Sequence, residues 1–435
     1  MKKTLTAVDA ASLIIGIVIG VGIFKAPSLV ALHTGNAILF FAVWLAGGAI
    51  SLIGALCYAE LAAAYPHPGG DYHYLLLALG KKPAFLFAWA RMTVMQTGSI
   101  AMLAFILGDY LSRVAPLGTY SSSIYAAVSI IVLTAVNAIG IKEGRITQKL
   151  LTLAIVAGIL FIVVGGLFFA APMPSGASPS PPVRPVLGLT MVFVLLTYGG
   201  WNEAAYISAE LRDIRKNMAR SLIWSISIIT LLYMLINITY WKILGVQGMG
   251  SSEAVAYDVM LRITGPGGAA LVSLLVAVSA LSSMNGVIIT GSRTNYALGR
   301  NFSLFRFLGR WDKDAATPAR ALTAQGIISL LLVLLGTVTM KGFVTMVEFT
   351  APVFWFFFLL TTQSLIVLRL KDTKTTRPFH VPLYPTTPVL FCCVCLFMLI
   401  SSIQYAGIGA LAGIVVLCGG LPFLMISKYH SVQER

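Results

Sequence analysis

Charged residues are scarce in this 435-residue sequence: Asp, Glu, Lys and Arg together make up 10% of it, whereas 58% of the residues are hydrophobic. A water-soluble domain carries roughly a quarter of its residues charged, so most of this surface cannot face water. The mean hydropathy of +0.89 points the same way. The sequence therefore predicts that lipid is the main solvent of this chain.

Acidic residues are the scarcest charges, with 15 Asp and Glu against 30 Lys and Arg, for a net charge of +15. Such a balance can indicate a nucleic-acid partner. If both termini face the cytoplasm, however, most Lys and Arg fall in inner segments, and the outer ones are Arg113, Arg184, Lys242, Arg262 and Lys341. This asymmetry follows the positive-inside rule. We expect a multi-pass protein of the cell membrane with cytoplasmic termini and no nucleic-acid partner.

Long polar stretches are also few, and apolar runs of about 20 residues, the length that crosses a bilayer, recur along the chain. The longest uncharged run, residues 384–427, exceeds one crossing and is divided at Gly407 and Gly409. An all-α membrane protein with twelve transmembrane helices is predicted. The helices start near residues 10, 37, 83, 121, 149, 187, 220, 266, 319, 342, 386 and 408.

Enzyme motifs are missing, because neither HExxH nor GxSxG occurs. The one rival feature is a group formed by His67, Asp71 and His73, which an intramembrane metal-dependent enzyme could use to hold an ion. Two of these residues flank a Pro- and Gly-rich loop, so a loop role is favoured. The five cysteines lie in apolar segments and are expected to pack rather than form disulfides. We expect no enzyme and no cofactor. A channel would need repeated polar rings along a pore, which the spans lack.

Glycine is concentrated in two spans. The first span contains Gly16, Gly20 and Gly22, and the sixth contains Gly199 and Gly200. Glycines at this spacing can simply allow close helix packing. Interrupted spans at matching positions of two halves, however, indicate an inverted-repeat transporter with a binding site near the bilayer midplane. The matched pair favours the second interpretation.

The segment 172–185, rich in Pro and Ser, separates the two halves. We expect a 5+5 inverted repeat with discontinuous helices 1 and 6, in which 1–171 is the first repeat and 187–370 the second. Residues 385–427 would form accessory helices 11 and 12. A helix break frees backbone groups that a polar ligand can satisfy: half-helix N-termini attract a carboxylate, and exposed carbonyls attract an ammonium group or a cation.

Several motifs resemble, in order and spacing, the amino acid, polyamine and organocation (APC) superfamily, most closely its amino acid permeases. They are Gly16-Ile-Val-Ile-Gly20-Val21-Gly22-Ile23-Phe24, Cys57-Tyr58-Ala59-Glu60-Leu61, Tyr198-Gly199-Gly200-Trp201-Asn202 and Arg377-Pro378-Phe379-His380-Val381-Pro382. The resemblance covers nearly the whole chain. It implies a LeuT-like fold and an amino acid moved by alternating access. Glu60, near a span end, is expected to form a structural ion pair.

The resemblance also implies where the substrate binds. Its carboxylate would meet N–H groups around Val21 and Gly22, and its amino group would meet carbonyls near Ile17 and Leu196. The implied site as a whole consists of Ile17, Gly20, Val21, Gly22, Leu196, Tyr198, Gly199, Trp201, Asn202 and Glu203. Val21 stands where many relatives have Ser or Ala, and Leu196 replaces a common aromatic gate residue, which suggests a narrower carboxylate pocket and a looser lid.

A small or medium neutral amino acid is the expected substrate, because the implied pocket has no certain counter-charge. Glu203 keeps a cationic amino acid or an amine open. The expected partners are this small molecule and the lipid bilayer, and the chain would be a monomer or a homodimer.

Three hydroxyls in the eighth span could serve a coupling ion. Ser279, Ser282 and Ser283 are spaced so that they share one helical face. By resemblance, first-helix carbonyls at Gly16 and Ile19 would complete a sodium site, and a lysine that many sodium-independent relatives carry is replaced near Ile155. Simple packing of small residues is the alternative. Sodium coupling is favoured, while proton coupling or gating through Glu203 or Glu348, and exchange, stay open.

Overall fold

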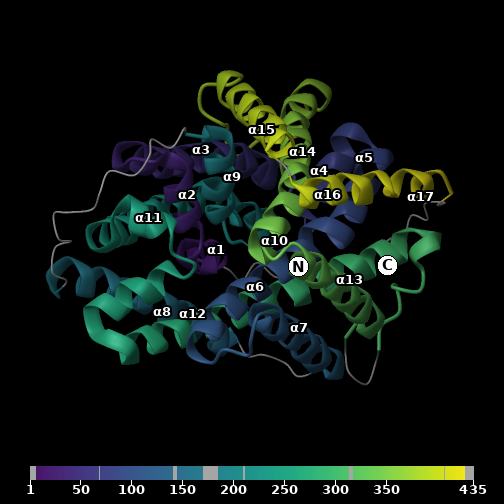
Figure 1. Cartoon of the computed structure of the whole chain (residues 1–435). Coiled ribbons are helices and arrows are strands. Elements are labelled where there is room, and N and C mark those ends of the chain that lie inside the picture. Colours follow the sequence, from purple (N-terminus) through teal and green to yellow (C-terminus); the bar gives the residue numbers. More distant parts are fainter. Residues whose placement is uncertain are drawn as a thin grey trace. The chain divides into compact units, whose positions relative to one another are not determined.

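The structure, a computed structural model, describes residues 6–67, 69–140, 145–169, 185–208, 211–312, 317–405 and 407–426. Within these ranges the chain is built of helices (Figure 1). β-type pairing among the described residues is confined to isolated bridge positions, such as the pair Asp312 and Thr317. The prediction of an all-α protein is confirmed.

Ten helices of the described chain are long and apolar enough to cross a membrane. The longest helices are α3 (Ala37–Ala64), α6 (Gln96–Val114), α7 (Ser121–Ile139), α8 (Arg145–Val164), α11 (Ile214–Gly250), α12 (Val255–Asn301), α13 (Ala319–Val338), α14 (Gly342–Lys371) and α15 (Thr386–Gln404). The shorter ones are α1 (Ala7–Val18), α2 (Ala26–Thr34), α4 (Gly70–Leu79), α5 (Lys81–Ala90), α9 (Leu187–Thr197), α10 (Ala204–Ile207), α16 (Ile408–Cys418) and α17 (Gly420–Ile426).

Two further apolar helical stretches, Leu153–Phe168 and Leu187–Thr197, are shorter than a full crossing and coincide with the predicted fifth and sixth spans. The last uncharged run is divided between α15 and α16 at the predicted position. The multi-pass architecture is thus confirmed, while the count of twelve spans stays a prediction.

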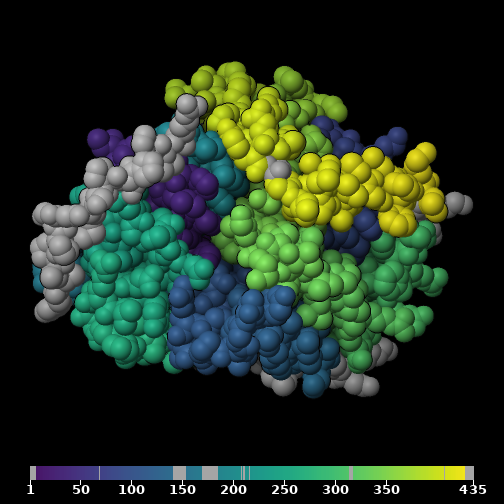
Figure 2. Space-filling view, in the orientation of Figure 1, coloured from purple at the N-terminus to yellow at the C-terminus, as the bar shows by residue number. Residues whose placement is uncertain are grey.

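Apolar side chains cover outward-facing surfaces of the helices. Ile38 is 86% exposed and Met425 is 88% exposed. The second of these lies in the C-terminal helices, drawn in yellow in Figure 2, whose apolar residues Leu411 and Val415 are also exposed. Apolar surface of this kind on so many helices fits a lipid environment.

The helices gather into two compact units whose segments alternate along the chain. Unit 1 consists of Met1–Lys81, Ala154–Val272 and Trp355–Tyr405, and unit 2 of Lys82–Leu153, Ser273–Phe354 and Ala406–Arg435. Unit 1 contains the predicted spans 1, 2, 6 and 7, whereas unit 2 contains spans 3, 4 and 9 and most of span 8. Because each predicted repeat contributes to both units, the division into repeats 1–171 and 187–370 stays a prediction.

Side-chain caps fix the starts of two helices in unit 1. Thr6 and Asp9 form a reciprocal capping box at the start of α1, and the Asn36 side chain accepts the Leu39 N–H at 2.8 Å at the start of α3. Such caps satisfy backbone donors that have no partner within the helix. They set the position at which the first two spans begin.

Glycines on α3 allow its neighbours in unit 1 to approach closely. A Cβ added at Gly47 would lie 3.1 Å from the Tyr198 ring. One added at Gly48 would collide with the Thr230 side chain of α11. Small residues at these positions let α9 and α11 pack directly on α3, which places the end of α9 against the middle of the bundle.

Unit 2 contains buried amide pairs that join its helices. Asn137 on α7 donates to Asn285 on α12 at 2.5 Å, and Asn295 on α12 donates to Gln325 on α13 at 3.1 Å. Buried amides need such partners. These contacts fix α7, α12 and α13 to one another within the unit.

Candidate functional site

The first predicted span is interrupted near its middle. Helix α1 ends at Val18, Gly20 has an extended backbone (φ −89°, ψ −173°), and a 3₁₀ turn, η1 (Val21–Phe24), comes next, before α2. Helix propensity is lowest, apart from proline, for glycine, which makes Gly20 a weak point in the helix. The chain therefore crosses the position of Gly20 without continuing the helix.

The interruption separates backbone N–H donors from backbone carbonyl acceptors. The Ile19 N–H donates to Ile15 O at 2.7 Å and the Gly20 N–H to Val18 O at 2.6 Å, which closes the end of α1. The N–H groups of Val21 and Gly22 come before the first internal bonds of η1, where helical segments have unused donors. The break thus places donors at the start of η1 and carbonyls at the end of α1.

The second break comes after α9. The Gly199 N–H donates to Leu196 O at 3.0 Å, and Gly200 has a φ of +107°. A side chain at that positive φ would strain the backbone. The chain then forms the short 3₁₀ turn η4 (Trp201–Glu203) and continues into α10. Gly200 is thus the turning point of the sixth predicted span.

The two breaks lie against each other within unit 1. A Cβ added at Gly200 would lie 2.9 Å from Cγ2 of Ile17, and one added at Gly22 would lie 3.4 Å from Cγ2 of Thr197. The structure therefore brings together the two groups of residues, from spans one and six, that the sequence assigned to a single site. We call residues 17–22 and 196–203 the paired breaks.

Burial differs among the residues of the paired breaks. Val21 is fully buried, and Tyr198 and Asn202 are buried as well. Gly20, Gly22, Leu196, Gly199 and Glu203 are half-buried, whereas the Ile17 side chain is 44% exposed. Ile17 is thus the most exposed side chain of this region, while Leu196 and Glu203 remain partly accessible.

Two aromatic residues of the paired breaks pack into unit 1. The Tyr198 ring lies 5.1 Å from that of Tyr233, and its hydroxyl donates to Trp44 O at 3.1 Å. The Trp201 indole stacks on Phe358 at 5.7 Å and meets the Tyr58 ring edge-on at 5.2 Å. Both side chains anchor the second break to α3, α11 and α14.

Tyr233 is the functional candidate that the sequence did not reveal. Its hydroxyl lies 2.9 Å from Val18 O and 3.1 Å from Thr197 O, the carbonyls at the ends of α1 and α9. In the sequence, a tyrosine inside an apolar span indicates a packing residue. Only the structure shows that its hydroxyl contacts both breaks.

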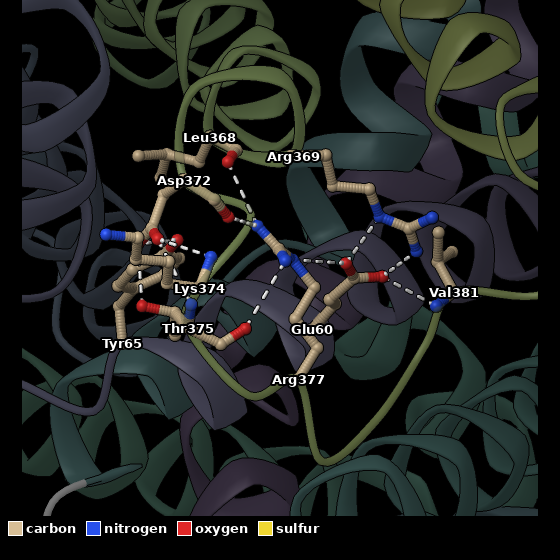
Figure 3. Close-up of polar contacts among 9 residues, drawn as sticks. All are labelled: Glu60, Tyr65, Leu368, Arg369, Asp372, Lys374, Thr375, Arg377 and Val381. Carbon is tan, nitrogen blue, oxygen red and sulfur yellow. Dashed lines mark hydrogen bonds and ion pairs between the residues drawn. The ribbon is translucent and has the colours of Figure 1, made fainter.

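A second polar region of unit 1 surrounds Glu60, near the end of α3 (Figure 3). The Glu60 carboxylate is fully buried and accepts hydrogen bonds from Nε and Nη2 of Arg369, at 2.7 and 2.5 Å. Nε of Arg377 lies 3.7 Å away, and the Val381 N–H donates at 2.7 Å. We call these four residues the Glu60 cluster. The cluster connects the end of α14 and the segment after it to α3. The structural ion pair that was expected for Glu60 is therefore present.

Further bonds order the segment that comes after α14. Asp372 accepts from the Tyr65 hydroxyl at 2.9 Å and from the Thr375 hydroxyl at 2.6 Å. The bonds from Thr375 and Tyr65 lower the pKa of Asp372 to about 2, so the carboxylate stays ionised at physiological pH. Arg377 also donates to Leu368 O at 2.9 Å and to Asp372 O at 2.7 Å.

The model of the amino acid permease family matches residues 5–423, nearly the whole chain. The chain belongs to the amino acid permease family. The resemblance expected from the broken-span motifs is therefore confirmed, and so is the prediction of a membrane transporter rather than an enzyme.

Several known amino acid transporters are similar in sequence to this permease over most of its length. The human b(0,+)-type amino acid transporter 1 is 30% identical over 417 residues, which is 93% of this chain and 83% of the relative. The mouse large neutral amino acids transporter small subunit 2 is 30% identical over 447 residues, covering 100% and 83%. The mouse Asc-type amino acid transporter 1 is 28% identical over 449 residues, with the same coverage.

The predicted sodium ligands belong to different units of the permease, Gly16 and Ile19 to unit 1 and the three serines to unit 2. The Ser279 hydroxyl is buried and has no hydrogen-bond partner among the residues that the structure describes. Ser282 is also buried and Ser283 is half-buried. The sodium site as a whole stays a prediction.

Glu348, the second candidate proton or gating residue, lies on α14. Its carboxylate lies against the backbone at the start of α16, where a Cβ added at Gly407 would lie 2.6 Å from Oε2 of Glu348. Carboxylates at helix N-termini complement the helix dipole and the unused donors there. This contact gives Glu348 a structural role within unit 2.

The two histidines of the rival metal hypothesis stack on each other, with ring centroids 4.0 Å apart. The Gly69 N–H donates to His67 Nδ1 at 2.9 Å, and the Tyr206 hydroxyl donates to Asp71 at 3.1 Å. Burial, together with the neighbouring His67, lowers the pKa of His73 to about 4. In the described parts of the chain, no three His, Cys, Asp or Glu side chains converge as metal ligands would.

Proposed function

We propose that this permease carries a small or medium neutral amino acid across the membrane at the paired breaks. The observation that carries the proposal is the contact of two interrupted helices, one of which begins with the Val21 and Gly22 N–H groups while the other ends in carbonyls. The donors suit a carboxylate, and the helix-end carbonyls suit an ammonium group. An amino acid carries both groups and can therefore meet such a site at both ends.

The character of the nearby side chains supports a neutral substrate. Val21, Leu196 and Tyr198 bring no charge to the paired breaks. One relative is named a transporter of large neutral amino acids, and its substrates have the same net charge as the substrate proposed here. Glu203, half-buried directly after the second break, supports the alternative of a cationic amino acid or an amine.

Alternating access would use the two units as its moving bodies. Unit 1 holds both breaks, and unit 2 holds spans 3, 4 and 9 and most of span 8. A site that is complete within one body keeps its geometry while access to it changes. The internal contacts of each unit, through the Glu60 cluster in one and the Asn137–Asn285 pair in the other, support rigid-body movement.

Sodium is the coupling ion that we favour. A buried hydroxyl that lacks a hydrogen-bond partner in the described chain, such as that of Ser279, costs free energy unless a ligand satisfies it. The position of Glu348 against the start of α16 supports a structural rather than a proton-carrying role for that carboxylate. Proton coupling through Glu203, and exchange of one amino acid for another, are the alternatives.

The test of substrate class is uptake by the purified full chain in proteoliposomes, with a panel of neutral and cationic amino acids and amines. Saturable uptake of neutral amino acids, blocked by neither the corresponding amino alcohols nor N-acetyl amino acids, is expected, because each analogue lacks one of the two charged groups. Preferential uptake of cationic compounds that E203Q abolishes would favour the alternative.

The test of coupling compares uptake in sodium, potassium and choline media. Sodium coupling predicts accumulation that needs an inward sodium gradient and that weakens in S279A. Equal uptake in the three media, with dependence on internal amino acid, would instead show exchange. A pH gradient that drives uptake in wild type but not in E203Q would show proton coupling.

A further inference from the structure

Two fully buried side chains of unit 1, one on α3 and one on α11, each have a polar atom with no hydrogen-bond partner among the described residues. These atoms are Nε1 of Trp44, a donor, and Oδ1 of Asn237, an acceptor. A buried polar atom without a partner costs free energy, and native structures rarely leave one unsatisfied. The pair therefore calls for a ligand that can satisfy both atoms.

The two side chains lie at the same level of one helix pair. The Trp44 ring is 5.9 Å from that of Tyr233 on α11, and one turn earlier on α3 the Phe41 ring is 5.8 Å from that of Trp241. Asn237 lies midway between these two α11 residues, four positions from each, so all three share one helical face. The helices are thus antiparallel, and Asn237 lies on the α11 face that meets Trp44.

A hydrogen bond to the backbone fixes the orientation of the Asn237 amide. Its Nδ2 donates to Tyr233 O at 2.7 Å. The reversed amide would place two oxygen acceptors against each other. Oδ1 is therefore the atom that needs a donor from elsewhere.

Aromatic neighbours hold the Trp44 indole. Its ring lies 6.1 Å from that of Tyr198 and 6.4 Å from that of Phe40. The backbone carbonyl of Trp44 also accepts the Tyr198 hydroxyl at 3.1 Å. Turning the indole toward another acceptor would disrupt the ring contacts, so the acceptor for its N–H has to come to it.

We propose that α3 and α11 bind one water molecule between Trp44 and Asn237. The water oxygen accepts the Trp44 Nε1–H, and one water proton is donated to Asn237 Oδ1. A site with one neutral donor and one neutral acceptor suits water, which does both. A cation would meet the indole N–H, and a carboxylate would meet the amide oxygen, so neither fits.

The bound water joins the second predicted span to the seventh. Because Trp44 also contacts Tyr198 through its ring and its carbonyl, the water supports the second break from behind. The inference concerns how unit 1 is held together, and it does not depend on which solute the permease carries.

The deciding measurement is a cryo-electron microscopy map of the full wild-type chain that resolves ordered waters, recorded with and without a saturating neutral amino acid. A separate density peak is expected in both maps, about 2.7–3.2 Å from both Trp44 Nε1 and Asn237 Oδ1. The proposal would be overturned by an empty position, by a direct bond between the two side chains, or by density that belongs to the bound amino acid.

Thermal unfolding of purified variants gives a second readout. W44F removes the donor and N237L the acceptor, and each single variant leaves the other group incompletely satisfied. The W44F/N237L double variant removes the whole site, so its unfolding temperature should fall by less than the sum of the two single losses. Additive losses would contradict the shared water.

Thr239 supplies the matched control on α11. It is fully buried, and its hydroxyl donates to Leu235 O at 3.0 Å within the helix. T239V therefore removes a buried polar group that has its own partner. Its effect should add to that of W44F, and coupling as strong as that between W44F and N237L would overturn the proposal.

Discussion

The paired breaks and the Glu60 cluster are both polar regions inside unit 1, yet they treat their polar groups in opposite ways. In the Glu60 cluster, one buried carboxylate receives two arginines and a backbone N–H. At the paired breaks, the Val21 and Gly22 donors begin a short helical turn and have no partner within it. The first region uses its hydrogen-bonding capacity for the fold, and we propose that the second keeps it for a ligand.

This difference separates stability from binding. A change at the Glu60 cluster should lower the free energy of unfolding and leave the KM of the surviving protein unchanged. A change at the paired breaks should alter the transport kinetics, whether or not it also lowers the free energy of unfolding. Substitutions in the two regions can therefore be compared by their effects on unfolding and on transport.

The largest effect is expected for Glu60→Gln. The substitution leaves Arg369 and Arg377 beside a neutral amide, and removing one partner of a buried ion pair typically costs about 3–5 kcal/mol. Thermal unfolding of the purified protein should shift strongly downward, and much of the protein should fail to reach the membrane. Glu60→Asp, which keeps the charge but shortens the side chain, serves as the control and should fall in between. An unchanged unfolding temperature would refute the role given to the cluster.

The next effect concerns two glycines of the paired breaks. At Gly200, alanine meets a φ of +107° and the Ile17 side chain, a strain of about 1–3 kcal/mol. At Gly22 an added Cβ would sit 3.4 Å from Thr197, an ordinary contact. Kinetics in proteoliposomes should therefore show a loss of kcat/KM of tenfold or more for G200A and a much smaller one for G22A. Equal losses would mean that the geometry of the second break is not what matters.

A smaller effect is expected for Arg369→Lys. Lysine retains the charge but cannot place two parallel N–H groups on the Glu60 carboxylate. Stability should fall by about 1 kcal/mol, seen as a modest drop in unfolding temperature. The KM for substrate is expected to stay at the wild-type value, and a KM that rises with intact stability would connect the two regions that we separate.

The smallest effect is a pH dependence at His73, which lies outside the spans. Its folded pKa, about 4, is below the ordinary value of 6.5. The unfolded chain therefore binds this proton first as pH falls, and stability decreases from about pH 6.5 down to pH 4. Because the ring is only half-buried, solvent screening limits the loss to about 1 kcal/mol. Unfolding measured at pH 7 and pH 4.5 should show less pH dependence in H73F than in wild type.

The sequence predicted the features that depend on local composition. Glycines in the first and sixth spans predicted the positions of the breaks, because glycine weakens a helix at Gly20 and permits the positive φ of Gly200. Apolar run lengths placed the membrane helices. An ion pair was expected for Glu60.

Features that depend on contacts between distant segments could not be predicted from the sequence. Glu60 and Arg369 are 309 positions apart, and nothing local connects them. Tyr233 lies in an apolar span in which an aromatic residue suggests packing, so its hydroxyl gave no signal. The interleaving of segments in the two units also depends on tertiary contacts that periodicity does not encode.

The central claim is that the paired breaks hold the two charged ends of an amino acid. A cryo-electron microscopy map of the full chain with a saturating neutral amino acid tests it most directly. The account predicts ligand density with its carboxylate at the Val21 and Gly22 N–H groups and its amino group at the carbonyls near Ile17 and Leu196. Ligand density elsewhere, with spans one and six running as continuous helices, would contradict it.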